Sequence, residues 1–168
     1  MLKELTKREK MNFSTKEIAK ITRKKLKEEY PNCKFSVTSE YFSMGSSITI
    51  SLMKSDRKIK KDFKDISEKA FWDYENRLYD KGRIEQLQKE DYHQLNQYNL
   101  REKYNPDTWC NGVFLTEKGH NLLKKVVETV QYYNWDNSDI QTDYFDVHFY
   151  LHMQLGKWDK PFIDGNNN

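Results

Sequence analysis

The chain of 168 residues is poor in the residue types on which many enzyme sites depend. Its two cysteines, Cys33 and Cys110, belong to no CxxC pair and to no cluster with histidine, so the sequence indicates neither a disulfide framework nor a zinc knuckle. The six glycines form no phosphate-binding loop, no GxSxG elbow and no nicotinamide-binding fingerprint. We therefore expect a protein that is not an enzyme and that uses no cofactor.

Long apolar runs are also absent. No window approaches the roughly 18 apolar residues of a membrane span. The start, MLKELTKREKM, lacks the apolar run of about 7–15 residues that a signal peptide needs. We expect a cytoplasmic protein, in the reducing cytosol of a host cell, with no membrane partner.

Neither sign of charge dominates. The 29 basic and 26 acidic residues give a net charge of +3, so any basic patch must be local. The mean hydropathy of −1.02 would suggest disorder, but 9 Phe, 4 Trp and 11 Tyr can fill an interior. We expect a basic N-terminal arm at 1–11, a single domain at 12–163 and a disordered tail at 164–168.

A helix start is clearly marked near residue 14. Ser14 is placed to cap the helix and Glu17 to close a capping box, and the periodicity predicts an amphipathic helix that runs to about Glu29. Contact with nucleic-acid phosphates and a plain solvated surface both stay open for its basic face. That face carries Lys16, Lys20, Arg23, Lys24 and Lys27.

The rest of the chain alternates between strand and helix patterns. Residues 34–54 predict a β-hairpin with Gly45 in the turn. The charged middle segment, 54–104, predicts helices at about 61–77 and 83–96. A short strand is expected from Val113 to Leu115, and Thr116 then caps a helix. The core side of this helix carries Leu122, Leu123, Val126, Val127 and Val130.

Apolar and polar side chains alternate most regularly between Phe145 and Leu155. This pattern predicts a strand whose odd positions are buried and whose even positions form a solvent-exposed, or wet, side. We therefore expect an α+β fold in a single domain. Its mostly antiparallel sheet would contain the hairpin, the short strand and this C-terminal strand, with helices covering one face.

The wet side of the last strand carries His148, Tyr150 and His152, and Trp158 follows. On a strand the two histidines stand about 13 Å apart, too far to bind one metal ion directly. Tyrosine and histidine suit contact with another surface, so these four residues are candidates for partner binding. We expect this face to be covered by the middle segment, by a partner or by a second copy, with a solvated face as the alternative.

An acidic group, Asp136, Asp139 and Asp143, is a weak candidate for a metal site because hard cations prefer carboxylate oxygens. With a nearby histidine, the region from Asp136 to Asp146 would suit a metal-assisted hydrolase. Asx turns or helix caps are the favoured interpretation of Asp136 and Asp139.

Two stretches resemble a known family. STKEIAKITRKKLKEEYPNCKFSVTSEYFSMGSSITISL is similar to the large polyvalent protein-associated domain 29 of phage and mobile-element proteins. The tail YYNWDNSDIQTDYFDVHFYLHMQLGKWDKPF resembles that of versions from low-GC bacteria, whereas the charged middle segment departs from the family pattern. The resemblance implies an α+β domain without established catalytic residues. It also implies an accessory or counter-defence protein, such as an anti-CRISPR, that acts by binding a host or element protein or nucleoprotein complex.

Overall fold

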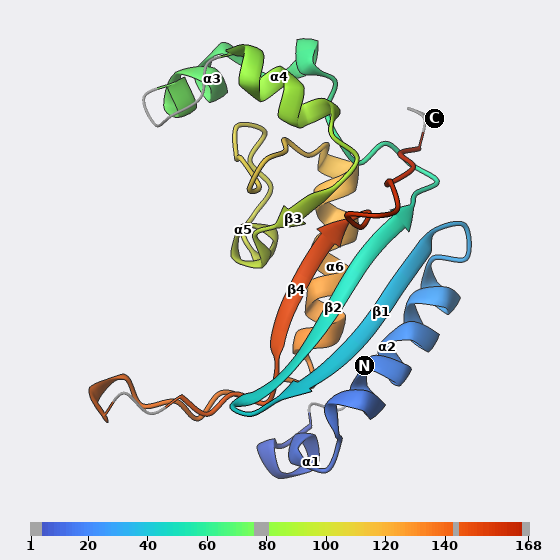
Figure 1. Cartoon of the computed structure of the whole chain (residues 1–168), viewed down its shortest axis with the longest axis vertical. Helices are drawn as coiled ribbons and strands as arrows, with labels where there is room; N and C mark the ends of the chain where they lie inside the picture. Colours follow the sequence, from blue (N-terminus) through green and yellow to red (C-terminus); the bar gives the residue numbers. More distant parts are fainter. Residues whose placement is uncertain (1–4, 76–80, 143–144, 166–168) are drawn as a thin grey trace.

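A four-stranded sheet lies at the centre of the computed structural model, which describes residues 5–75, 81–142 and 145–165 (Figure 1). The hairpin strands β1 (Lys34–Phe42) and β2 (Gly45–Lys54) are antiparallel, as expected. β4 (Tyr150–Leu155) runs parallel to β2, and β3 (His93–Leu95) runs antiparallel to β4. The strand order is therefore β1-β2-β4-β3. The predicted α+β class is confirmed, with a mixed sheet.

Two long helices cover one face of this sheet. Ser14 caps α2 (Thr15–Glu29) and Thr116 caps α6 (Glu117–Gln131), as the sequence predicts. The apolar sides of both helices pack in one core with Ile48, Ile50 and Leu52 of β2. Burial of such side chains stabilises the domain by about 1.5–3 kcal/mol each. Figure 1 views the sheet from its other side, here named the open face, with α6 behind it.

The N-terminal residues expected in a basic arm are docked on the domain instead. Residues 7–11 form α1 (Lys7–Met11), which Thr6 caps in a second capping box with Glu9. The Leu5 N–H donates to the hydroxyl of Tyr132 at 3.2 Å. The Thr6–Glu9 spacing, the same as that of Ser14 and Glu17, starts this helix.

The charged middle segment contains η1 (Phe63–Asp65), α3 (Glu68–Glu75), α4 (Lys81–Lys89), β3 and α5 (Gln97–Arg101). The first predicted helix begins later than residue 61 because the Ser67 hydroxyl accepts the N–H of Ala70 at 3.0 Å and starts α3 there. The prediction of a helix at 83–96 was wrong at its end, where β3 pairs with β4. Residues 76–80 lie outside the described part. A second, smaller core forms here from Ile66, Ala70, Phe71, Ile84 and Phe114.

The short strand expected at 113–115 is not part of the sheet. Phe114 and Leu115 make only isolated bridges, to Trp109 and Lys60 respectively. The strand that pairs with the outer edge of β4 is β3 instead, because its three residues stand in register with residues of β4.

The alternation from Phe145 overestimates the length of the last strand, which begins at Tyr150. The odd positions from 149 to 155 are buried as expected, but Phe145 is exposed and Val147 is half-buried. Before Tyr150 the neighbour on the outer edge is the loop after α6: Val147 makes an isolated bridge to Asp136. Alternation alone does not show where the neighbouring strand ends.

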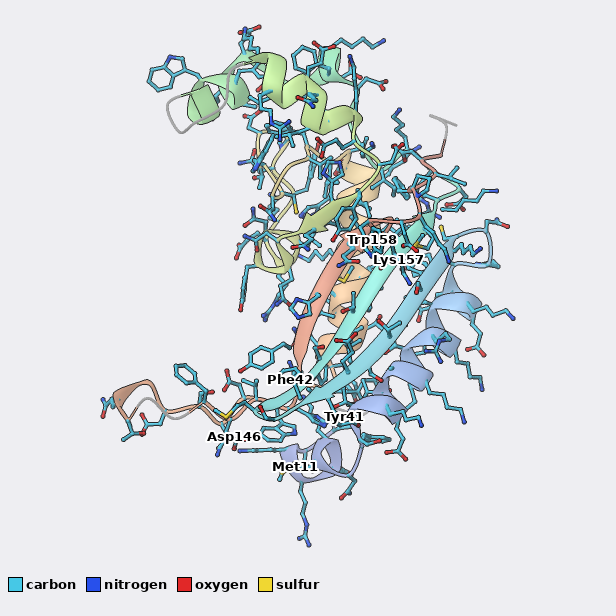
Figure 2. The ribbon with its side chains drawn as sticks, viewed as in Figure 1. Met11, Tyr41, Phe42, Asp146, Lys157 and Trp158 are labelled. Carbon is cyan, nitrogen blue, oxygen red and sulfur yellow. The ribbon has the colours of Figure 1, made fainter. Side chains whose placement is uncertain are left out.

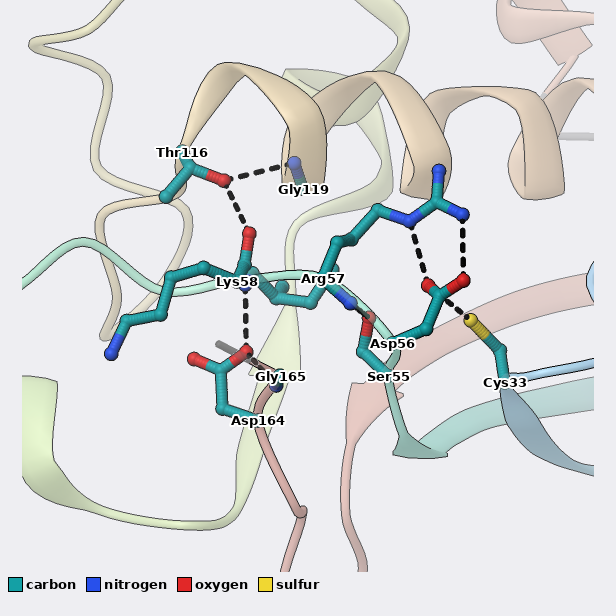
Figure 3. A network of polar contacts seen from close by, with 10 residues as sticks. Cys33, Ser55, Asp56, Arg57, Lys58, Thr116, Gly119, Asp164 and Gly165 are labelled. Carbon is teal, nitrogen blue, oxygen red and sulfur yellow. Dashed lines mark hydrogen bonds and ion pairs between the residues drawn. The ribbon is translucent and has the colours of Figure 1, made fainter. Parts of the chain in front are cut away.

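The C-terminal residues 164 and 165, expected in a disordered tail, are tied to the domain. The Asp164 carboxylate accepts the backbone N–H groups of Ile59 at 2.7 Å and Lys60 at 3.1 Å. Figure 3 shows the surroundings of this contact, in which the Thr116 hydroxyl donates to the carbonyl of Lys58 at 2.7 Å.

An ion pair between Arg57 and Asp56 belongs to the same group of polar contacts. The Arg57 guanidinium donates to the Asp56 carboxylate at 2.8 Å, and this bond is the main reason why the pKa of the Asp56 carboxyl lies below its ordinary value (Figure 3). The Cys33 thiol donates to the same carboxylate at 3.3 Å. These contacts connect the loop before β1 with the end of β2.

Candidate binding surfaces

Exposed apolar side chains gather at the closed end of the β1–β2 hairpin. Phe42 is 48% exposed and Tyr150 is 43% exposed, and their rings stack with centroids 6.2 Å apart. Met44 in the turn is 87% exposed. The loop that precedes β4 runs past this end of the hairpin (Figure 1). We name this the hairpin-end surface; it consists of Phe42, Met44 and Tyr150.

The backbone conformation of the turn favours glycine. Gly45 begins β2 at a φ of +153°, which L side chains rarely adopt. A Cβ atom at this position would touch ring atoms of Phe42 and Tyr150 at 3.4 and 3.5 Å, which are ordinary contact distances. The φ angle, and not a lack of room beside the rings, is therefore what a substitution here would strain.

Hydrogen bonds hold the hairpin end in place. The buried Ser46 hydroxyl donates to the carbonyl of His148 at 2.9 Å and contacts the Thr15 hydroxyl at 2.7 Å. The Lys16 N–H donates to the Tyr41 hydroxyl at 3.2 Å. The surface is thus fixed to the start of α2 and to the loop before β4, so little conformational entropy remains to be lost on binding.

The open face is polar and carries exposed groups from β4. His152 is exposed, and the Gln154 carboxamide accepts the Ser51 hydroxyl at 3.1 Å. Tyr98 of α5 stands beside this face and is 68% exposed. The remaining residues of the face on β1 and β2 are mostly small: Ser36, Thr38, Glu40, Ser47, Thr49 and Ser51.

The four residues expected to bind a partner do not form one surface. Tyr150 and His152 share the open face, and the described part of the middle segment leaves both exposed. Of the three expected covers, the middle segment is therefore not the one, and cover by a partner or a second copy stays a prediction. His148 precedes β4, stacks on Trp135 with centroids 5.4 Å apart and contacts the carbonyl of Tyr133 at 3.3 Å. Trp158 is 86% exposed beyond the opposite end of β4, far from Phe42 (Figure 2).

The basic face of α2 is exposed as expected. Arg23 also donates to the carbonyl of Val37 at 2.6 Å, which ties its guanidinium to β1. Lys24 pairs with Glu28 at 3.9 Å. The other three cations of this face, Lys16, Lys20 and Lys27, are exposed on the same helix.

The acidic residues act in the local turns. The Asp136 carboxylate accepts the N–H of Ser138 at 2.8 Å, and hydrogen bonds from Ser138 hold the pKa of this carboxyl below its ordinary value. The Asp139 carboxylate accepts the N–H of Gln141 at 2.9 Å. The favoured Asx-turn interpretation is confirmed for both, while Asp143 lies outside the described residues. Within the described ranges, no three His, Cys, Asp or Glu side chains are grouped so that they could hold a metal ion.

Phe42 and Met44 of the hairpin-end surface were not predicted from the sequence. Phe42 lies at an even position of β1, whereas Phe35 and Val37 set the buried side at odd positions. Met44 is an apolar residue in a turn. An apolar side chain at a polar position of an alternating strand was the available signal.

In the described part of the chain, no helix is both long and apolar enough to cross a membrane.

Comparisons with known proteins identify a family. No curated protein and no solved structure matches the chain significantly. The family model described as large polyvalent protein associated domain 29 matches residues 13–105, more than half of the chain, and this range includes the charged middle segment. The chain therefore belongs to the large polyvalent protein associated domain 29 family.

Proposed function

We propose that this chain is a non-catalytic binding protein of a phage or mobile genetic element and that it docks a protein partner through the hairpin-end surface. The family associates the chain with polyvalent proteins of such elements. The observation that carries the proposal is the grouping of three large, exposed apolar side chains, Phe42, Met44 and Tyr150, at the closed end of the hairpin. Grouped exposed apolar side chains mark interaction sites, whereas single ones are ordinary.

The composition of this surface suits a protein interface. Aromatic residues and methionine are enriched in such interfaces, and the residues that contribute most to affinity are commonly aromatic. Phe42 and Tyr150 are already stacked in the free chain, so fixing their side chains on binding costs little conformational entropy. Glu40, which lies two residues from Phe42 on the same side of β1, supplies a polar group beside it.

Within this proposal, the partner is a host protein and the role is an accessory or counter-defence one. A protein that acts by occupying a surface needs neither a cofactor nor a catalytic group. The preformed apolar surface supports such a mode of action, because it can cover part of a target without any chemical step.

The test is the double variant Phe42→Ser with Tyr150→Ser. Both side chains are about half exposed, so we expect a cooperative fold and a loss of at least tenfold in partner binding, since aromatic hot spots contribute about 2 kcal/mol or more. Trp158→Ser is the matched control, because it removes a more exposed aromatic from the opposite end of β4.

The measurement combines two readouts. Tagged protein is used to capture interacting proteins from the bacterial host, and sedimentation reports self-association of the purified chain. Loss of one stoichiometric protein in the double variant but not in the control supports the proposal. Equal capture by all three proteins would refute it, and loss of self-association alone would identify the partner as a second copy.

A second candidate function is nucleic-acid binding through α2, favoured by its five exposed cations on one side. A phosphate binder should lose affinity steeply between about 50 and 200 mM salt. Lys20→Glu combined with Lys27→Glu should abolish the binding, and Lys64→Glu, an exposed lysine of η1, serves as the control. Absence of binding to any DNA or RNA at low salt would remove this candidate.

A further inference from the structure

The outer edge of β4 has an unpaired position at Leu151. The Gly156 N–H donates to the carbonyl of Leu52 in β2 at 2.9 Å. Because the backbone groups of successive strand residues point to opposite sides, residues 151, 153 and 155 therefore turn theirs to the outer edge. Leu155 and Met153 stand opposite β3 there. Leu151 would stand opposite residue 97, but α5 begins at that residue, so no described residue pairs with the Leu151 N–H and carbonyl.

The next edge position shows what such a pair of groups can bind. The Phe149 N–H donates to the Asn134 carboxamide oxygen at 3.3 Å, and the Phe149 carbonyl accepts the Asn134 amide at 3.1 Å. A planar group with a donor and an acceptor side by side thus replaces a neighbouring strand. Leu151 presents the same two groups one step along the edge.

A hollow of about 390 Å³ adjoins this edge. A chain of carboxamides forms part of its wall: Asn134 donates to Gln131 at 3.0 Å, and Gln131 donates to Gln97 at 3.2 Å. Tyr98 and Arg101 of α5 also line it. A second hollow of about 610 Å³ lies over the open face and shares Gln97, Tyr98 and Leu151 with the first. Asn96, Asn111 and His152 are among its other lining residues.

We propose that these two hollows form a groove for single-stranded nucleic acid, in which a base pairs its Watson–Crick edge with the backbone of Leu151 and stacks on Tyr98. Every base carries a donor next to an acceptor on that edge, which matches the unpaired N–H and carbonyl. The exposed Tyr98 ring offers the flat apolar surface on which bases stack. Arg101 is exposed at the groove and supplies charge for a phosphate.

The alternative occupant of the groove is a carboxamide side chain of a protein partner. It would form hydrogen bonds with the Leu151 N–H and carbonyl and with the carboxamides that line the groove. It would leave the Tyr98 ring and the Arg101 guanidinium without a binding partner. Asp136 also lines the first hollow, and its carboxylate already accepts the N–H of Ser138. A nucleotide would contact more of the groove's residues than a carboxamide side chain would. This inference goes beyond the proposed function and does not depend on it.

The test is an NMR titration of the full ¹⁵N-labelled chain with three probes. These are a single strand of about ten nucleotides, the duplex of the same sequence, and N-acetyl-glutamine methylamide. We expect the single strand to shift the Leu151 amide signal while leaving that of Leu155, which is paired with β3. The duplex should not compete, because its base edges are already paired.

Variants of Tyr98 separate stacking from charge. Tyr98→Ala should weaken single-strand binding about 10- to 100-fold and Tyr98→Phe should retain it, as expected from the typical strength of base–aromatic stacking. Trp158→Ala is the control for loss of an exposed aromatic elsewhere.

Four outcomes would overturn the proposal: no shift at Leu151 with excess single strand, equal binding of the duplex, unchanged affinity of Tyr98→Ala, or a Leu151 shift with the glutamine probe alone. Shifts confined to α2 would assign nucleic-acid binding to the basic helix instead. Tyr150 belongs to the hairpin-end surface and also lines the first hollow, so Phe42→Ser, which leaves this lining intact, keeps the two proposals distinguishable.

Discussion

The Gln88 side chain is the central polar contact between α4 and the rest of the domain. It is buried, and its carboxamide donates to the carbonyls of Lys61 at 2.8 Å and Phe114 at 2.9 Å and accepts the Phe114 N–H at 2.8 Å. Gln88→Leu keeps the size of the side chain and removes all three bonds. The change therefore tests whether the charged middle segment folds as part of the domain.

The cost of Gln88→Leu follows from the groups that lose a partner. The Phe114 carbonyl keeps the N–H of Lys61 at 3.0 Å, but the Phe114 N–H and the Lys61 carbonyl lose the bonds that Gln88 makes. An unsatisfied buried group costs about 1–3 kcal/mol, and the added apolar burial offsets a part of this. We expect a loss of about 2–3 kcal/mol in the free energy of unfolding. For a chain of this size, that lowers the melting temperature by roughly 4–12 °C.

Urea unfolding followed by tryptophan fluorescence measures this loss. Gln86→Leu is the matched control, because Gln86 lies on the same helix and is exposed, and its side chain bonds only to Arg83 among the described contacts. It should change stability by less than about 0.5 kcal/mol. A Gln88→Leu variant as stable as this control would refute the proposed role of the side chain.

Three further predictions concern single groups. Gly119→Ala should destabilise the chain despite alanine's helix preference, because its Cβ would lie 2.6 Å from the carbonyl oxygen of Ile59; equal or higher thermal stability would contradict this. Burial lowers the pKa of His93 below its ordinary 6.5, so below that pH the unfolded chain binds a proton that the folded chain does not, and stability falls. The loss of stability between about pH 7.5 and 5.5 should therefore be smaller in His93→Gln, and an unchanged loss would show that another group is responsible. Burial raises the pKa of the Cys110 thiol to about 11, so at about pH 8 iodoacetamide should label the half-buried Cys33 faster than Cys110 in the folded chain; equal rates would be unexpected.

The elements with local signals were predictable from the sequence. Ser14 and Thr116 have the side chains and spacings that start helices, and Gly45 marks the hairpin turn. β3 was not predictable, because three residues become a strand only through their register with β4. For the same reason, the start of β4 at Tyr150 depends on where its neighbours end.

The candidate site was predictable only in part. Tyr150 was predicted because a tyrosine on the solvent-facing side of a strand suits contact with another surface. Phe42 likewise stands on the polar side of β1, and Met44 is an apolar residue in a turn. The separation of His148 and Trp158 from Tyr150 depends on tertiary structure, since side-chain parity does not reveal that the strand begins at 150 and ends at 155. The family match ends at residue 105, yet β4 lies between β2 and β3, so residues outside the match complete the sheet.

The measurement that tests the proposed function most directly is photo-crosslinking inside the host cell. Benzoylphenylalanine replaces Phe42 in one variant and Trp158 in another, so that the probe stands at the hairpin-end surface or at the far end of the sheet. We predict that position 42 crosslinks one discrete protein and that position 158 does not. Crosslinks to the same protein from both positions with equal yield, or none from position 42, would contradict the proposal that this surface binds a protein partner.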